Sequence, residues 1–306
     1  MSTGTALLPS LVSSAELNDA LAAPSAPIRV LDATTFLHTT VEAAPYTASN
    51  GYEQYLGEHI PGALFADVTG ALSAPDAAQL FTIPSPEQFA QAAQDLGVGS
   101  DTHVVVYDTG GSAWATRVWW LFRLFGHDGV SVLDGGLGAW KAAGHPVAAG
   151  DADIAAAAEA AAPVFIPDFR SHLVATKNEL EATLPGVATA PEGTVVVNAL
   201  DPATFVGESE LSPYARRGRI PGSVNLPLYT LLDQATGRFL PTDQLTEKLQ
   251  AQGVLDAQRA VTYCGGGIAA TLPAFAAFLA AGVEVAVYDG SLSEWTADES
   301  LPVELG

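Results

Sequence analysis

Short apolar runs alternate with helix-like segments along the whole chain. The runs typical of buried strands are residues 28–33, 103–107, 130–133, 194–199, 260–263 and 284–288. Helix-like stretches follow several of them, at residues 86–96, 114–125 and 269–281. Strands that alternate with helices in this way predict an α/β fold with mostly parallel sheets flanked by helices.

Landmarks of the first half recur in the second half at a nearly constant spacing. A turn with Ile-Pro-Gly follows His59 and again Arg219, 160 residues later. Asp108 and Cys264 each follow a predicted strand, 156 residues apart. Such a spacing indicates a tandem duplication. We expect a first domain at residues 1–150, a linker at 151–170 and a second domain at 171–306.

Cys264 is the only cysteine of the chain, and it opens a glycine-rich loop at the end of a predicted strand. The loop consists of Gly265, Gly266, Gly267, Ile268 and Ala269. Successive glycines let backbone N–H groups converge on one centre, and the following helix adds the positive end of its dipole. Both features favour a thiolate, so the pattern predicts an exposed, stabilised nucleophile; the alternative is a small buried hydrophobic residue. Because Asp108 stands where the second copy has Cys264, the first copy cannot carry out thiol chemistry and is expected to be chemically inert.

The overall composition narrows the possible partners. The formal net charge of −22 argues against nucleic acid or an acidic membrane as a partner. One cysteine excludes an internal disulfide framework and a paired-cysteine metal site. The first 17 residues lack a signal-peptide pattern, and the apolar windows are too short to span a bilayer. We expect a soluble cytoplasmic protein that needs no metal and no organic cofactor, while its oligomeric state is left open.

Six short motifs, in this order, carry a resemblance to a known family. They are His59-Ile60-Pro61-Gly62-Ala63, Ala115-Thr116-Arg117-Val118-Trp119-Trp120, Phe125-Gly126-His127, Val132-Leu133-Asp134-Gly135-Gly136, Arg219-Ile220-Pro221-Gly222-Ser223-Val224-Asn225 and Cys264-Gly265-Gly266-Gly267-Ile268-Ala269. The chain resembles the rhodanese family of two-domain thiosulfate and 3-mercaptopyruvate sulfurtransferases. The resemblance implies an inactive first domain and a second domain in which Cys264 takes sulfur from a small anionic donor and passes it to a thiophilic acceptor, such as cyanide or a thiol.

The chain departs from that family's pattern where the sulfur donor binds. Leu200 and Thr204 stand where the family usually has arginines, and Gly266 stands where it has lysine or serine. The only basic cluster surrounds Arg217 and Arg219, which we consider as replacements that bind the donor. A surface loop whose arginines pair with nearby glutamates is an equally good interpretation.

A structural interpretation is available for four further kinds of residue. The resemblance implies that His59 approaches the cysteine loop from the first domain, although a structural turn histidine fits as well. Arg117 is interpreted as a structural residue that holds a carboxylate between layers. Trp119 and Trp120 are interpreted as core aromatics. Asp134 and Asp289 are interpreted as turn formers.

The hypothesis is a sulfurtransferase with Cys264 as nucleophile and thiosulfate as the favoured donor. The alternatives are a 3-mercaptopyruvate sulfurtransferase, a non-enzymatic persulfide carrier or sensor, and a cysteine phosphatase. A phosphatase needs an arginine six residues after its cysteine, where this chain has Ala270. A redox sensor would lack a resolving cysteine within the chain.

Overall fold

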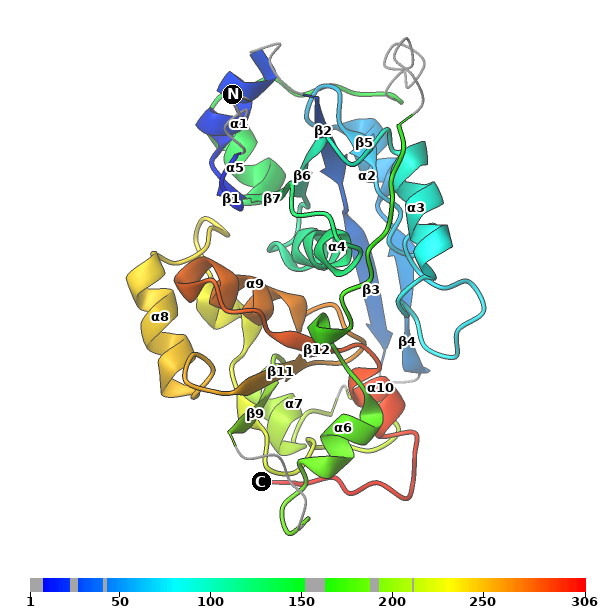
Figure 1. The fold of residues 1–306 in the computed structure, drawn as a ribbon, viewed down its shortest axis with the longest axis vertical. Helices are drawn as coiled ribbons and strands as arrows, with labels where there is room; N and C mark the ends of the chain where they lie inside the picture. The colour runs from blue at the N-terminus through cyan, green and yellow to red at the C-terminus, as the bar shows by residue number, and fades with distance from the viewer. Residues whose placement is uncertain (1–7, 23–26, 41–42, 152–162, 188–192, 211) are drawn as a thin grey trace.

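A computed structural model describes residues 8–22, 27–40, 43–151, 163–187, 193–210 and 212–306. Two α/β units follow one another along the chain, and each is built on a five-stranded parallel sheet (Figure 1). The predicted tandem α/β fold is confirmed. Within the described residues, no helix has the length and apolar character needed to cross a membrane.

The first sheet is formed by valine-rich strands whose side chains are almost all buried. Its strand order is β1 (Leu11–Val12), β7 (Val130–Leu133), β6 (His103–Tyr107), β2 (Ile28–Asp32) and β5 (Leu64–Phe65). The helices are α1 (Ser14–Ala22), α2 (Tyr52–Gly57), α3 (Pro86–Asp95), α4 (Ala113–Leu124) and α5 (Gly136–Ala142). Local signals set some of their ends. The Ser85 side chain, for example, accepts a hydrogen bond from the Gln88 amide and caps α3.

The second sheet repeats the first. Its strand order is β10 (Val224–Asn225), β9 (Thr194–Asn198), β11 (Arg259–Tyr263), β12 (Ala286–Tyr288) and β8 (Val174–Ala175). The helical segments are Ser171–Leu173, α6 (Lys177–Ala182), α7 (Pro202–Val206), Leu228–Leu231, α8 (Thr242–Ala251), α9 (Thr271–Ala281) and α10 (Ser291–Trp295). In both copies the two central strands pair over five residues, β2 with β6 and β9 with β11. The duplication read from the landmarks is therefore also a duplication of topology.

An antiparallel hairpin, β3 (Thr35–Thr40) and β4 (Ala43–Asn50), interrupts the first copy after β2. The apolar pattern did not predict it. In Figure 1 the hairpin runs from the first domain down to α10 of the second. Tyr46 on β4 reaches Ser293 on α10, with 3.5 Å between their hydroxyl oxygens. The hairpin therefore links the first domain to the region of the cysteine loop.

The predicted linker at 151–170 falls largely on residues 152–162, which lie outside the described residues. The described part returns along the end of α4, because the amides of Asp168 and Arg170 donate to the carbonyls of Phe125 and Leu124. The domain boundary stays a prediction.

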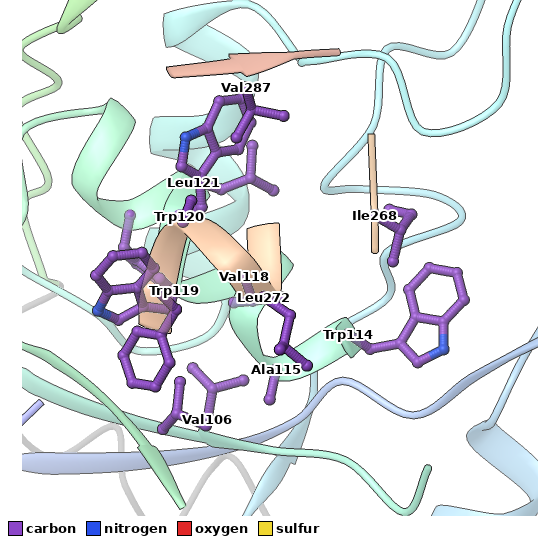
Figure 2. Close-up of a cluster of buried hydrophobic side chains, with 14 of the residues drawn as sticks. Val106, Trp114, Ala115, Val118, Trp119, Trp120, Leu121, Ile268, Leu272 and Val287 are labelled. Atoms are coloured by element: carbon purple, nitrogen blue, oxygen red, sulfur yellow. The ribbon is translucent and has the colours of Figure 1, made fainter. Parts of the chain in front are cut away.

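The two domains meet through equivalent helices, α4 of the first and α9 of the second. Thr116 and Thr271 occupy corresponding positions on them, and their hydroxyl oxygens are 2.9 Å apart. Trp119 packs edge-on against Phe275, with 4.7 Å between ring centroids. Figure 2 shows Trp119 of α4 and Leu272 of α9 in this cluster of buried side chains, with Trp114 of α4 on the same side of it as Ile268 of the cysteine loop. Trp119 and Trp120 are thus core aromatics, as predicted.

Two hydrogen bonds across the interface are related in the same way. The Phe239 amide of the second domain donates to Asp134 of the first at 2.9 Å. The Ile83 amide of the first domain donates to Asp289 of the second at 2.9 Å. Residue i of one copy thus contacts residue j of the other, and the reverse also holds, as in an isologous dimer interface. The two aspartates do more than form turns: they join the domains.

Arg117 lies at the centre of this interface and is fully buried. Its Nη1 is 2.6 Å from Asp289 Oδ1 and donates to the Gly267 carbonyl at 3.1 Å. Its Nη2 donates to the Phe81 carbonyl, and the guanidinium lies 4.9 Å from the Trp120 ring centroid. The predicted structural role of Arg117 is confirmed, and the residue also holds the cysteine loop.

We expect Arg117→Met to lower the free energy of unfolding by about 3 kcal/mol, because it leaves the largely enclosed Asp289 carboxylate, 12% exposed, without its cation. Urea unfolding followed by tryptophan fluorescence measures this loss. Lys141→Met is the control, since Lys141 pairs with Glu58 at the surface and its loss is expected to cost less than about 1 kcal/mol. Equal losses in the two variants would contradict the assignment.

Candidate active site

Cys264 directly follows β11 and begins the loop that leads into α9. Its side chain is only 2% exposed, within the apolar cluster shared by both domains. The prediction of an exposed thiolate is therefore wrong. The reason is tertiary: two tyrosines, Tyr46 and Tyr214, lie against the loop from other segments. The sequence of the loop itself does not indicate that these tyrosines lie there.

Ser291 is the polar neighbour of the buried sulfur. Its Oγ accepts hydrogen bonds from the amides of Cys264 and Gly267, both at 3.1 Å, and lies 4.0 Å from Sγ. It donates to the Tyr288 carbonyl at 2.8 Å. Ser291 has φ of 50°, a left-handed conformation that costs energy for any residue with a β-carbon. The first copy has Gly136 at the corresponding place, with φ of 55°.

The loop of the first copy shows what its backbone amides do when a negative group is present. Asp108 Oδ1 accepts from the amides of Gly110 and Ser112, at 2.9 and 3.0 Å. Asp108 Oδ2 accepts from the amides of Trp114 and Ala115, both at 3.0 Å. The first loop is therefore an anion-binding nest whose occupant is its own carboxylate.

The second loop has free amides at the corresponding spacing. The amides of Gly266, Ile268 and Ala270 stand two, four and six residues after Cys264, and they donate to no acceptor within the described chain. The amides of Gly265 and Ala269 also donate to no acceptor within the described chain. Cys264 stands where the first copy has the carboxylate of Asp108, and none of these amides donates to it. These donors are therefore available to an anion on or beside the sulfur.

Different constraints require glycine at the three glycine positions of the loop. Gly267 has φ of 77°, and a β-carbon there would lie 2.7 Å from Asp289 Oδ1. Backbone conformation and the interdomain ion pair both require glycine at this position. At Gly265 and Gly266 φ lies outside the left-handed region, so only neighbouring side chains exclude a β-carbon.

Arg219 binds groups of the carboxyl-terminal segment. Its guanidinium donates to the Gly306 carbonyl and to Glu304 Oε1, both at 2.6 Å, and lies 4.5 Å from the Phe205 ring centroid. These contacts hold the carboxyl-terminal segment, so the geometry favours a structural role. Arg217 is exposed and has no ion-pair partner among the described residues. Its donor-binding role stays a prediction.

His59 lies at the turn that follows α2 in the first domain. Its Nδ1 is 2.8 Å from the Tyr55 carbonyl, and its ring stacks on the Tyr55 ring at 4.3 Å between centroids. Its backbone pairs with Ala148, as the backbone of Arg219 pairs with Glu304 in the second copy. These contacts are those of a structural turn histidine, and among the described residues none of them joins His59 to the cysteine loop.

A hollow of about 460 Å³ opens next to the cysteine loop. Both domains contribute to its wall, Tyr46 and Gln79 from the first, Tyr214 and Ser293 from the second. The remaining wall is apolar, and no charged side chain lines it. Sequence reasoning missed the two tyrosines, because neither lies in a motif or near the cysteine in sequence. Within the described residues no cluster of His, Cys, Asp or Glu is arranged to hold a metal ion.

A model of the rhodanese-like domain matches residues 15–143 and 195–298, which together make up more than half of the chain. The chain belongs to the rhodanese-like family. One curated relative is the 3-mercaptopyruvate sulfurtransferase of Escherichia coli K12, 35% identical over 257 residues that cover 83% of this chain and 86% of the relative. Another is thiosulfate/3-mercaptopyruvate sulfurtransferase 1 of Arabidopsis thaliana, 32% identical over 293 residues that cover 90% and 74%.

A solved structure shows the same two-domain arrangement. The crystal structure of SseA from Escherichia coli, a 3-mercaptopyruvate sulfotransferase, matches this rhodanese-like chain with a TM-score of 0.74 at 29% identity. The match covers 92% of this chain and 98% of SseA. The resemblance read from six short motifs is thereby confirmed at the level of family and fold.

We expect Asp108→Ala to lower the free energy of unfolding of this rhodanese-like protein by about 3 kcal/mol or more, since it removes the acceptor of four amides, three of which make buried hydrogen bonds. The measurement is urea unfolding followed by circular dichroism. Asp233→Ala is the matched control, because Asp233 also accepts several local hydrogen bonds but is exposed. A loss no larger than that of the control would show that the nest does not stabilise the first domain.

Proposed function

We propose that this rhodanese-like protein is a sulfurtransferase that carries a sulfane sulfur on Cys264. The observation that supports this most is the run of loop amides without an acceptor directly after the only cysteine, in a loop whose counterpart in the first copy binds its own carboxylate. A thiolate and a persulfide both place negative charge where these donors can stabilise it. The sulfurtransferase relatives support the same reaction class.

The relay has two steps in this proposal. In the first, the Cys264 thiolate attacks the outer sulfur of the donor, a new S–S bond forms, and the donor's bond to that sulfur breaks. Its electron pair leaves with sulfite, or with the enolate of pyruvate, which then takes up a proton. In the second step cyanide or a thiol attacks the outer sulfur of the persulfide, and the electron pair returns to Cys264. Neither step needs an external oxidant.

Thiosulfate is the favoured donor on the sequence argument, since a loop of glycines leaves the anion to backbone amides. The hollow favours a second candidate, 3-mercaptopyruvate. Its apolar wall with hydroxyl groups has room for a carbon skeleton beside the sulfur. A test of the proposal therefore has to compare thiosulfate with 3-mercaptopyruvate.

We expect the protein to gain the mass of one sulfur atom when it is incubated with thiosulfate or 3-mercaptopyruvate, and to lose it on addition of cyanide. Intact-mass spectrometry measures both changes and identifies the donor. Cys264→Ser is the control and is expected to gain nothing, because serine forms no persulfide. No gain in the wild-type protein with either donor would contradict the relay, whereas a gain without catalytic turnover would favour a persulfide carrier.

Arg217 and Arg219 are expected to respond differently to removal of their charge. Arg217→Ala should raise KM for the anionic donor by a factor of about two to five at low salt, because an exposed charge contributes up to about 1 kcal/mol. Arg219→Ala should lower the unfolding temperature, since it releases the carboxyl-terminal segment. Arg238→Ala removes the same charge from another exposed position and serves as control. An unchanged KM for Arg217→Ala relative to this control would exclude its role.

A further inference from the structure

Two tyrosine hydroxyls occupy the places where side chains of the cysteine loop would lie. Tyr214 Oη is 2.1 Å from the position of a β-carbon on Gly265. Tyr46 Oη is 2.1 Å from the position of a β-carbon on Gly266. The backbone itself would accept a side chain at both glycines, because neither has a positive φ. The glycines are therefore explained by the phenols that approach them.

The two phenols come from different domains and meet over the loop. Tyr46 lies on the hairpin that reaches across to α10 (Figure 1), and Tyr214 lies in the loop before Arg216. Their rings pack edge to face, with 6.4 Å between centroids. Both also line the hollow next to the loop. A molecule in this hollow thus lies against both tyrosines, whose hydroxyls reach Gly265 and Gly266.

Both hydroxyls are available as hydrogen-bond donors. Tyr214 Oη has no hydrogen-bond partner within the described residues. Tyr46 Oη has Ser293 Oγ at 3.5 Å, a long contact, and that serine already donates to the Gly265 carbonyl at 2.7 Å. Burial raises the pKa of both phenols, and the nearby Cys264 side chain adds to the rise. The two groups therefore keep their protons at neutral and mildly alkaline pH.

Among the described residues that line the hollow, none offers a positive charge to an anionic donor. The hollow contains no charged residue, and Leu200 and Thr204 stand where the resemblance leads one to expect arginines. The Thr204 hydroxyl is itself bonded to Asp201 at 2.6 Å. On a molecule with a net charge of −22, an anion has to be held by close neutral donors.

We propose that Tyr46 and Tyr214 are substrate-binding residues, whose hydroxyls donate hydrogen bonds to the negatively charged group of the sulfur donor beside Cys264. They supply from outside the loop what side chains at positions 265 and 266 would otherwise supply. The proposal rests on the proposed sulfurtransferase function. It also assigns a function to the β3–β4 hairpin, which completes the site from the first domain.

The first test removes each hydroxyl alone, in Tyr46→Phe and Tyr214→Phe. We expect kcat/KM for persulfide formation to fall about ten- to a hundredfold in each variant, which corresponds to the loss of a hydrogen bond to a charged group. Single-turnover kinetics with thiosulfate and with 3-mercaptopyruvate separate this step from discharge by cyanide, which should change less. Tyr229→Phe is the matched control, since Tyr229 is exposed at the surface of the second domain, the domain of Tyr214.

The second test delivers a hydroxyl from the loop instead of the hairpin. Gly266→Ser alone should impair persulfide formation, because its β-carbon displaces the Tyr46 hydroxyl. Combined with Tyr46→Ala, the same substitution has room, and activity should recover well above that of Tyr46→Ala alone. This is a non-additive pair of the kind that contacting residues give.

The outcomes separate the two proposals. A wild-type protein that takes up no sulfur from either donor would overturn the proposed function, and this inference with it. A wild-type gain of sulfur with unchanged rates in both phenylalanine variants would overturn this inference alone and leave the tyrosines as packing residues. Strict additivity of Gly266→Ser and Tyr46→Ala would also overturn it.

Discussion

The buried guanidinium of Arg117 is the point at which the two domains and the cysteine loop are joined. It pairs with Asp289 and binds the Gly267 carbonyl of the second domain, while it belongs to α4 of the first. A buried charge is costly unless all of its partners are in place. Docking of the domains therefore contributes one of the contacts that hold the loop, beside those from Ser291 and Ser293. The domains dock with approximate two-fold symmetry, and the Thr116–Thr271 hydroxyl contact lies between the corresponding helices.

The duplicated loops solve one electrostatic problem in two ways. Backbone amides that converge at the end of a strand need a negative group. In the first copy this group is the side-chain carboxylate of Asp108, so the loop satisfies its own amides. In the second copy Cys264 leaves the amides of Gly266, Ile268 and Ala270 without an acceptor. The first copy thus shows which amides a negative group at this position of the loop binds.

The site combines a strongly acidic protein with an uncharged pocket. Short-range donors, such as amides and phenols, bind an anion through geometry, whereas a distant arginine acts through a field that salt screens. In this molecule most arginines already have structural partners: Arg117 holds the interface, and Arg219 holds the carboxyl-terminal segment. The neutral character of the hollow agrees with that division of labour.

Local sequence alone predicted the parallel strands, the helix after the cysteine, the duplication and the glycine loop around Cys264, because period, turn residues and spacing are properties of contiguous segments. It did not predict the burial of Cys264, the β3–β4 hairpin or the tyrosines over the loop. Tyr46 and its partner Ser293 are 247 residues apart, so no local pattern relates them. Likewise, the partners of Arg219 are Glu304 and Gly306, 85 and 87 residues away, rather than the glutamates near it in sequence. Which side chains meet at the sulfur was decided by domain docking, since contacts between distant segments depend on the whole packed structure.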